Sequence, residues 1–366
     1  MVCNHFYPVV GGEENHIYNL AKGLIEKGHI VQVYTSNKTY QREILPAIDM
    51  RDNIAIKRFS GKLSLFRAIL RTKCDIVHYH HYRSPFIDFG IIAGKLSKKK
   101  TVFTLHCVYP SKNFFNGIVK KTYDLSLGKI SLTFVDKIIA LTENDKRDAI
   151  KLGTNPTKIK IVPNCILFEK FKVLEKPALF NEKFGINRFI LYVGRLDWNK
   201  GVKYVVQAMP DIMKDYPDMK FVIIGEDVGY KKEIENEIER LNIRKSVMFL
   251  GRINNKELLS AYAACSVLVC PSAYEGLPTV ILEAMAYKRP VIATRTGGTS
   301  YVIKDGYNGY LVDFADPKGI YKAVIKAVGN KEVGENARRE VEVKYTWEKA
   351  ILQIEQTYET LLNTEL

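Results

Sequence analysis

Short apolar runs alternate along the chain with amphipathic stretches of helical period. A helix is predicted just after Gly11-Gly12, because apolar residues recur at helical spacing from Ile17 to Ile25 and Gly28 then supplies a stop. Alternation of β-rich runs with such helices is typical of a mostly parallel, doubly wound α/β sheet. In the first half of the chain, the runs that we predict as strands lie at 30–35, 75–80, 101–106, 137–141 and 158–163.

The alternation stops in a stretch that contains Lys and Pro, and it restarts with FILYVG at 189–194. A chain of 366 residues also exceeds what one hydrophobic core usually organises. We therefore expect two Rossmann-like domains, residues 1–172 and 188–345, joined by a linker at 173–187. The final segment, 346–366, has the pattern of one amphipathic helix, which we expect to pack back on the N-terminal domain. The other predicted strands of the second domain lie at 220–225, 246–251, 266–270 and 290–294.

The composition is that of an ordinary folded protein, with 46% apolar and 26% charged residues. No uncharged stretch reaches the roughly 20 predominantly apolar residues that a membrane-spanning helix needs. The N-terminus also lacks the basic start and long apolar run of a secretory signal, so we expect a cytoplasmic protein. The six cysteines form no CxxC pair, which favours buried, reduced thiols over a zinc site.

The net charge of +15 is concentrated in the first half of the chain, where residues 1–187 hold 30 Lys and Arg against 16 Asp and Glu. A field of this sign attracts nucleic acid, anionic lipid or an acidic substrate without distinguishing among them. A soluble surface that is simply rich in Lys would give the same balance.

Residues of unusual type follow two apolar runs of the second predicted sheet, where open α/β sheets bind their ligands. Arg195 follows FILYVG, and Lys200 lies five residues later; two cations at a strand-to-helix junction suit a diphosphate. Glu275 falls in the loop after SVLVC, and Glu283 falls about a turn and a half inside the next helix, where carboxylates can bind sugar or ribose hydroxyls. The same helix start offers an anion site built from the backbone N–H groups of Gly276, Leu277 and Thr279.

These motifs together resemble glycosyltransferase family 4, the retaining enzymes with the GT-B fold, in which two doubly wound domains face each other across a cleft. The resemblance covers essentially the whole chain, and the pairing of E-x7-E with an upstream G-R-x4-K is its specific part. The segments that carry it are FYPVVGGEENHIYNLAKGLIEKGH, DIVHYH, VFTLH, ILYVGRLDWNKG, VIIGE, VMFLGRI and PSAYEGLPTVILEAMAYKRPVIATRTGG.

The resemblance implies a role for each matching residue. Glu275 would hold the hydroxyls of the donor sugar and Glu283 the ribose, while Arg195 and Lys200 would neutralise the diphosphate of a UDP- or GDP-linked sugar. Two further implications concern the N-terminal domain: Gly11 and Gly12 would let the backbone approach the donor, and His106 would lie beside the reacting sugar as a catalytic residue with Glu275.

Two departures from the family pattern limit what can be carried over, and one motif is absent. The usual P-N-G-V-D after the strand at 158–162 is here Pro163-Asn164-Cys165-Ile166-Leu167, which lacks both Gly and Asp. Relatives usually have several apolar residues before the position of Met1, so we expect the natural start to lie upstream. No Asp-x-Asp occurs to hold Mg²⁺ against the diphosphate, so we expect no metal, with protein cations and helix dipoles in its place.

The acceptor is expected to be a lipid-linked or polysaccharide precursor, with an anionic membrane surface as a partner. Two stretches, 61–73 and 111–123, mix basic and apolar residues as membrane-interface segments do. His80 could border the acceptor site or be structural. The residues that we place on the acceptor or membrane side are His80, Phe114, Phe115, Lys120 and Lys121.

Two other functions stay open on the sequence alone. An NDP-sugar epimerase of GT-B fold would interconvert sugars without a second substrate. A nucleic-acid-binding module would use the basic field, but the chain shows no aromatic-rich nucleic-acid motif.

Overall fold

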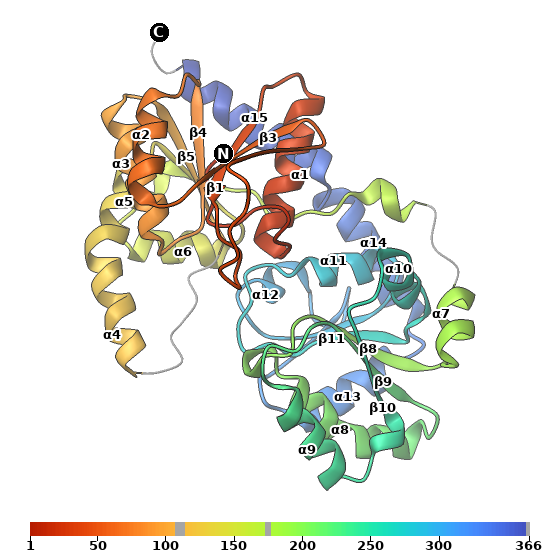
Figure 1. The fold of residues 1–366 in the computed structure, drawn as a ribbon. Helices are drawn as coiled ribbons and strands as arrows, with labels where there is room; N and C mark the ends of the chain where they lie inside the picture. The colour runs from red at the N-terminus through yellow and green to blue at the C-terminus, as the bar shows by residue number, and fades with distance from the viewer. Residues whose placement is uncertain (107–113, 173–176, 364–366) are drawn as a thin grey trace. The chain divides into compact units, whose positions relative to one another are not determined.

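The computed structural model describes residues 1–106, 114–172 and 177–363, without the side chains of 114–116. The chain divides into two compact units (Figure 1), each described here by itself. Unit 1 comprises Met1–Asn164 and Trp347–Leu366, and unit 2 comprises Cys165–Thr346. The division thus falls at 164/165, whereas the sequence placed the first domain's end at residue 172.

Unit 2 is built on six parallel strands in the order β10-β9-β8-β11-β12-β13. The chain winds outward from β8 in one direction and from β11 in the other, so the order reverses between these two neighbours. Such a reversal is the point at which doubly wound sheets bind ligands. The strands are β8 (Phe189–Val193), β9 (Lys220–Ile224), β10 (Val247–Gly251), β11 (Val267–Cys270), β12 (Val291–Thr294) and β13 (Tyr310–Val312).

Helices cover both faces of this sheet and bury two separate apolar clusters. The segment predicted as a linker contains helix α7, which packs against α10 within unit 2. The helices are α7 (Pro177–Phe184), α8 (Val202–Asp215), α9 (Lys231–Arg240), α10 (Asn255–Ala264), α11 (Thr279–Ala286), α12 (Thr299–Val302), α13 (Pro317–Ala327) and α14 (Lys331–Lys344).

Unit 1 has a second sheet in which Val2 alone stands where a first strand would lie. Val2 bridges to Tyr34 of β1 on one side and to Tyr79 of β4 on the other, which joins β2-β3-β1 to β4-β5-β6-β7. All pairings are parallel except β2 with β3. The strands are β1 (Gln32–Ser36), β2 (Ile48–Arg51), β3 (Ile54–Phe59), β4 (Ile76–His80), β5 (Lys100–Leu105), β6 (Lys137–Ala140) and β7 (Ile159–Ile161).

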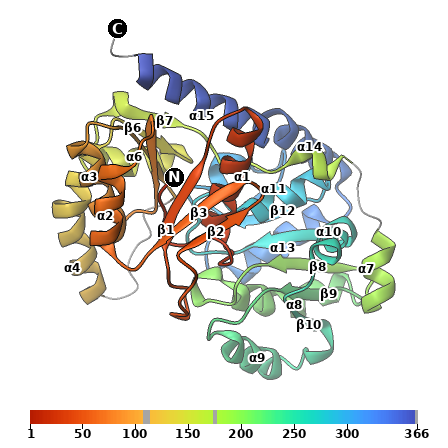
Figure 2. The ribbon, with the colours of Figure 1, turned by 45° about the horizontal axis from the view of Figure 1, so that its top comes forward.

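The C-terminal helix α15 (Trp347–Leu362) lies in unit 1 and packs against α1, as Figure 2 shows. The contact is close, because a Cβ added to Gly23 of α1 would lie 1.9 Å from Cδ1 of Ile351. The other helices of this unit are α1 (Gly12–Glu26), α2 (Lys62–Arg71), α3 (Pro85–Leu96), α4 (Phe114–Tyr123), α5 (Lys129–Phe134) and α6 (Glu143–Lys151).

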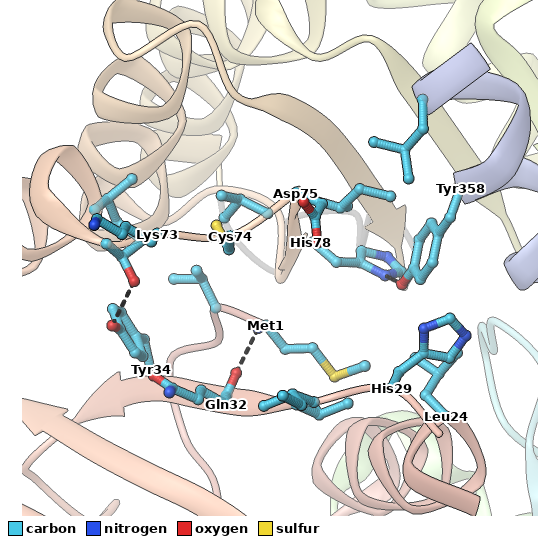
Figure 3. Close-up of a pocket in the computed structure, with 18 of the residues that line it drawn as sticks. Met1, Leu24, His29, Gln32, Tyr34, Lys73, Cys74, Asp75, His78 and Tyr358 are labelled. Atoms are coloured by element: carbon cyan, nitrogen blue, oxygen red, sulfur yellow. Dashed lines mark hydrogen bonds between the residues drawn. The ribbon is translucent and has the colours of Figure 1, made fainter. Parts of the chain in front are cut away.

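A cavity of about 360 Å³ lies in unit 1 at the amino ends of the strands that flank Met1 (Figure 3). The Met1 amine donates to the carbonyl of Gln32 at 2.7 Å, and Lys73 and Cys74 line the opposite side. The cavity therefore lies at the edge of the sheet opposite to the carboxyl ends that carry the candidate site. Among the described residues, no helix is both long and apolar enough to cross a membrane.

Candidate functional site

In unit 2, the two loops that follow β8 and β11 bring a cation and a carboxylate together. Nζ of Lys200 lies 2.6 Å from Oε1 of Glu275, and the side chains are only 21% and 10% exposed. The Ser272 hydroxyl donates to the same oxygen at 2.7 Å. Burial lowers the pKa of Lys200, but the Glu275 carboxylate raises it by more, so the ammonium stays charged. The pair thus offers a fixed positive charge and a carboxylate with a second oxygen beside it.

Backbone contacts hold these two loops against each other. The amide of Ala273 donates to the carbonyl of Asn199 at 2.7 Å. Gly201 has a φ of +66°, and a Cβ there would lie 2.0 Å from the Pro271 carbonyl oxygen. Only glycine satisfies both conditions, so the G-R-x4-K-G sequence places Lys200 beside Glu275 through its final glycine.

Glu283 lies inside α11, the helix that follows the loop carrying Glu275. Its Oε2 accepts from the Tyr262 hydroxyl at 2.7 Å. Burial raises the pKa of Glu283, whereas the bond from Tyr262 opposes that rise. Tyr262 comes from α10, and neither it nor Ser272 was predicted as a site residue. Both could have been found only by knowing which elements pack together.

The remaining predicted donor residues lie at the same edge of the sheet. The Arg195 side chain is exposed directly after β8, and within the described residues no hydrogen bond or ion pair to it is present. Gly276 and Leu277 are buried in the loop before α11, and Thr279 is the first residue of that helix. The first N–H groups of a helix lack intrahelical partners, so this end of α11 can receive an anion.

In unit 1, the predicted glycines start α1. Gly11 is the extended N-cap and Gly12 the first helical residue, where an added Cβ would meet nothing within 4 Å. Glu13 accepts from Nδ1 of His81 at 3.1 Å. Burial lowers the pKa of His81, but the Glu13 carboxylate raises it above its ordinary value. A hydrogen-bonded carboxylate and imidazole therefore lie near the open backbone of Gly12.

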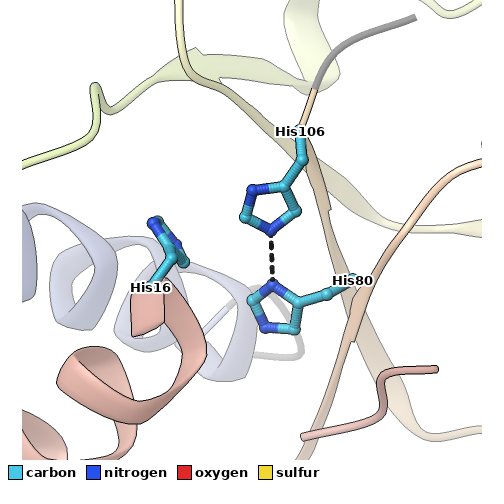
Figure 4. A group of neighbouring side chains, drawn as sticks. All are labelled: His16, His80 and His106. Atoms are coloured by element: carbon cyan, nitrogen blue, oxygen red, sulfur yellow. Dashed lines mark hydrogen bonds between the residues drawn. The ribbon is translucent and has the colours of Figure 1, made fainter. Parts of the chain in front are cut away.

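His106, at the carboxyl end of β5, belongs to a buried group of histidines (Figure 4). Its Nε2 lies 3.1 Å from Nδ1 of His80, which is fully buried rather than at a surface. His16 of α1 packs edge-on against His106, with ring centroids 4.8 Å apart and planes at 87°. Nδ1 of His16 bonds Oδ1 of Asn164 at 2.8 Å. These rings come from three elements far apart in the sequence, so the sequence did not reveal the group.

Burial keeps this group neutral. It lowers the pKa of His16 to about 3 and the pKa of His80 well below its ordinary value. Burial also lowers the pKa of His106, although the Glu13 carboxylate opposes that shift. One nitrogen from each of His16, His80 and His106 lies within 4.8 Å of the others, so these are the described residues that could approach a metal ion.

Four of the predicted acceptor-side residues lie on α4, whereas His80 ends β4. Lys120 is half-buried and Lys121 is exposed, whereas the side chains of Phe114 and Phe115 lie outside what the structure describes. In the other basic stretch, 61–73, the apolar residues differ in exposure: Ile69 of α2 is buried in the core, but Leu63 is 61% exposed.

Comparison with known proteins gives two family matches that follow each other along the chain. The model described as Glycosyltransferase Family 4 matches residues 10–169, and the model described as Glycosyl transferases group 1 matches residues 179–343. The residues Arg195, Lys200, Glu275 and Glu283 fall in the second match, and Gly11, Gly12 and His106 fall in the first.

Similar proteins cover nearly the whole chain. An uncharacterized glycosyltransferase of Methanocaldococcus jannaschii is 30% identical over 367 residues, covering 97% of this chain and 96% of that protein. One subunit of human phosphatidylinositol N-acetylglucosaminyltransferase is 27% identical over 380 residues, covering 98% of this chain and 75% of that protein. The crystal structure of Anabaena Alr3699/HepE in complex with UDP and glucose shares the fold, with a TM-score of 0.81, 18% identity and coverage of 98% and 99%.

Proposed function

Because the chain belongs to glycosyltransferase family 4 and has two Rossmann-like domains of the GT-B type, we propose that it transfers a hexose from a nucleoside-diphosphate sugar to a hydroxyl acceptor, with retention at the anomeric carbon. The observation that carries this proposal is the pair of Lys200 and Glu275, in contact at the switch point between β8 and β11. A diphosphate needs fixed cations, and a sugar needs carboxylates that accept hydroxyl bonds. Both are present at one sheet edge.

Each residue of unit 2 takes one part of the donor in this proposal. Lys200 and Arg195 stabilise the diphosphate, Glu275 accepts from sugar hydroxyls through its second oxygen, and Glu283 holds the ribose. The N–H groups at the start of α11, in the segment of Gly276, Leu277 and Thr279, add positive potential for the phosphates. The donor is UDP- or GDP-linked; UDP and UDP-glucose complexes of proteins with the same fold support the first choice.

The reaction breaks the bond between the anomeric carbon and the diphosphate oxygen. The acceptor oxygen forms the new bond on the same face, and its proton passes to the departing phosphate oxygen. The nucleoside diphosphate leaves with its added charge neutralised by Lys200 and Arg195. His106 contributes a hydrogen bond to the reacting sugar. We propose that these protein cations act in place of a metal ion.

Thermal stability with and without nucleotide sugars tests this function directly, since a ligand that binds only the folded state raises the apparent stability. UDP-, GDP- and ADP-sugars are screened in EDTA and again with Mg²⁺. We expect one nucleotide class to raise the melting temperature in EDTA, with a smaller rise in Lys200→Met and a normal rise in the exposed control Lys288→Met. Ligand binding and turnover that require Mg²⁺ would contradict the metal-free mechanism, and no rise with any donor would contradict the function.

We also propose a lipid-linked acceptor reached from an anionic membrane surface. The support comes from a surface on unit 1 that we call the α4–α5 surface, where exposed apolar side chains lie near basic side chains along residues 118–130. Basic amphipathic segments of this kind bind bilayer interfaces through apolar burial and attraction to anionic lipid. The name of the human relative, which places phosphatidylinositol in its substrate, agrees with a lipid acceptor. The surface consists of Ile118, Val119, Leu125, Leu127 and Ile130 with Lys120, Lys121 and Lys129.

A further inference from the structure

The contact between His80 and His106 limits which nitrogen of each ring can carry its hydrogen. Nδ1 of His80 and Nε2 of His106 are 3.1 Å apart, so one of them must carry the hydrogen that joins them. Both rings are held neutral by burial, and a neutral imidazole has one donor and one acceptor nitrogen. Choosing the donor therefore fixes the tautomer of both rings.

The second nitrogen of His80 decides between the two arrangements. Nε2 of His80 is buried and has no hydrogen-bond partner among the described residues. If His106 donated, the hydrogen of His80 would sit on that nitrogen as a buried, unpaired N–H. Orphaned N–H donors are rarer in proteins than under-satisfied acceptors. The arrangement with the hydrogen on Nδ1 of His80 leaves only a bare lone pair and is therefore favoured.

His78 holds the ring of His80 in the orientation that this bond needs. Both nitrogens of His78 are engaged, with the Tyr358 hydroxyl at 2.6 Å and with the Thr104 hydroxyl at 2.7 Å. The two rings stack, with centroids 4.4 Å apart and planes at 24°. Since Tyr358 lies on α15, the C-terminal helix anchors this stack through His78.

A bound metal ion is the competing explanation of the same cluster. In its favour, Nε2 of His16 is buried without a partner, and its Nδ1 bonds the side-chain oxygen of Asn164, as metal-bound histidines often do. Against it, a metal-bound His80 would also need a partner for its other nitrogen, and that nitrogen has none. No carboxylate belongs to the group of three. The hydrogen-bonded arrangement leaves fewer donors unsatisfied.

We infer that His80 is a positioning residue that donates from Nδ1 to Nε2 of His106 and so places the single hydrogen of His106 on Nδ1. Figure 4 shows one nitrogen of His106 turned toward His80 and the other turned away from it. Within the described residues Nδ1 of His106 has no partner, so His106 presents an N–H donor to a ligand oxygen rather than a lone pair. The inference rests on the proposed function only for the identity of that ligand, a sugar oxygen.

Nuclear magnetic resonance of protein labelled with ¹⁵N-histidine reads the tautomer without any substrate. In the wild type we expect His106 to be protonated on Nδ1 and not on Nε2. His80→Asn keeps an amide donor near the position of Nδ1 and should preserve this tautomer. His80→Asp supplies only an acceptor and should move the hydrogen to Nε2, whereas His80→Phe should give a mixture. His16→Phe is the matched control, because His16 contacts His106 through its ring alone and the tautomer should stay unchanged.

Three results would overturn the inference. The first is protonation of His106 on Nε2 in the wild type, and the second is a tautomer of His106 that stays the same in His80→Asp. The third is binding of stoichiometric Zn²⁺ that shifts the signals of His16, His80 and His106 together. Turnover adds a second readout, using hydrolysis of UDP-glucose or of the donor that the binding screen identifies. His80→Phe should lower kcat about 5- to 100-fold with KM for the donor nearly unchanged, the range for losing one buried hydrogen bond. His80→Asn should restore most of it. If the enzyme proves inactive on every donor, the proposed function fails while the tautomer result still stands or falls by itself.

Discussion

At the scale of single residues, Lys200 in unit 2 keeps its charge, whereas the buried histidines of unit 1 lose theirs. The pKa of Lys200 is raised by the Glu275 side chain at 2.6 Å, so its ammonium stays charged, and the Ser272 hydroxyl donates to the same Glu275 oxygen. Removing one partner of such a pair leaves the other charge uncompensated. The histidines of unit 1 instead lose their charge, because burial removes it at neutral pH. Unit 2 therefore offers a permanent positive charge, whereas His106 in unit 1 lies among neutral rings.

Substitutions of the ion pair should separate phosphate binding from sugar binding. Lys200→Met should weaken binding of the free nucleoside diphosphate by about 1–3 kcal/mol, as expected for losing a charged hydrogen-bond donor. Glu275→Gln keeps the positive charge of Lys200, so it should leave binding of the nucleoside diphosphate nearly intact, but it should lower turnover at least about 100-fold because the carboxylate that accepts from the sugar hydroxyls is lost. Titration calorimetry and initial rates measure the two effects, with Lys288→Met as the exposed control. Unchanged nucleotide affinity in Lys200→Met would show that the diphosphate does not bind at Lys200.

The neutral histidines predict a loss of stability in mild acid. The pKa of His16 is about 3 in the folded chain against 6.5 as its ordinary value. Between these values the unfolded chain binds the proton and the folded chain does not, so stability falls as pH decreases below about 6.5. From pH 7.5 to 5.0, His16 should account for about 2 kcal/mol of the lost free energy of unfolding. Urea unfolding at both pH values measures the loss of unfolding free energy in the wild type and in His16→Gln. The difference between the two losses is the contribution of His16, because other titrating groups such as Asp145 contribute equally to both. Equal losses in the two proteins would exclude the effect.

At the scale of elements, the regular alternation predicted most of both sheets, because parallel buried strands give continuous apolar runs. The hairpin of β2 and β3 was missed, although Asp52 and Asn53 both have positive φ at its turn, as a two-residue hairpin turn requires. Its strands alternate buried or half-buried with more exposed residues, so they lack a long apolar run. β13 was missed because three residues are too few to show a period.

The sequence predicted the candidate-site residues that belong to a motif, but not those that depend on how the elements pack together. Lys200 and Glu275 were named from the sequence, since each follows a predicted strand that ends at one sheet edge. The sequence did not name Tyr262 or Ser272, because a hydroxyl gives no signal until its partner is known. The contact between His80 and His106 likewise depends on the pairing of β4 with β5, which places residues 26 positions apart beside each other.

Close packing of loops gives an element-scale prediction at Gly298. Its φ is −75°, so alanine is compatible with the backbone, but an added Cβ would lie 1.1 Å from the Gly276 carbonyl oxygen. Gly298→Ala must push the loop after β12 away from the start of α11. We expect a loss of about 1–3 kcal/mol in the free energy of unfolding, the usual cost of overpacking, together with weaker nucleotide binding. Gly61→Ala is the control, because nothing lies within 4 Å of a Cβ there. Normal nucleotide affinity in Gly298→Ala would show that the start of α11 takes no part in donor binding.

At the scale of the whole molecule, the charge is divided unequally along the chain. The basic excess belongs to residues 1–187, whereas the donor-binding residues Arg195, Lys200, Glu275 and Glu283 all belong to unit 2. The diphosphate therefore does not explain the basic excess of the first half. The proposed anionic partner of unit 1 would account for it, and the α4–α5 surface adds exposed apolar side chains, with Leu125 70% and Val119 68% exposed. Apolar contact combined with positive charge distinguishes a lipid interface from nucleic acid.

Vesicle cosedimentation tests whether the α4–α5 surface contacts an anionic membrane, by comparing two variants of equal net charge. Lys120→Glu with Lys121→Glu alters the α4–α5 surface, and Lys22→Glu with Lys38→Glu makes the same change of charge at exposed positions of unit 1 outside it. Each basic residue near an anionic surface contributes about 1 kcal/mol, so losing two should weaken binding at least about 30-fold. We expect that loss in the first variant alone, on anionic but not on neutral vesicles. Because long-range attraction depends on net charge whereas docking depends on position, equal losses in both variants would exclude a specific membrane contact through α4 and α5.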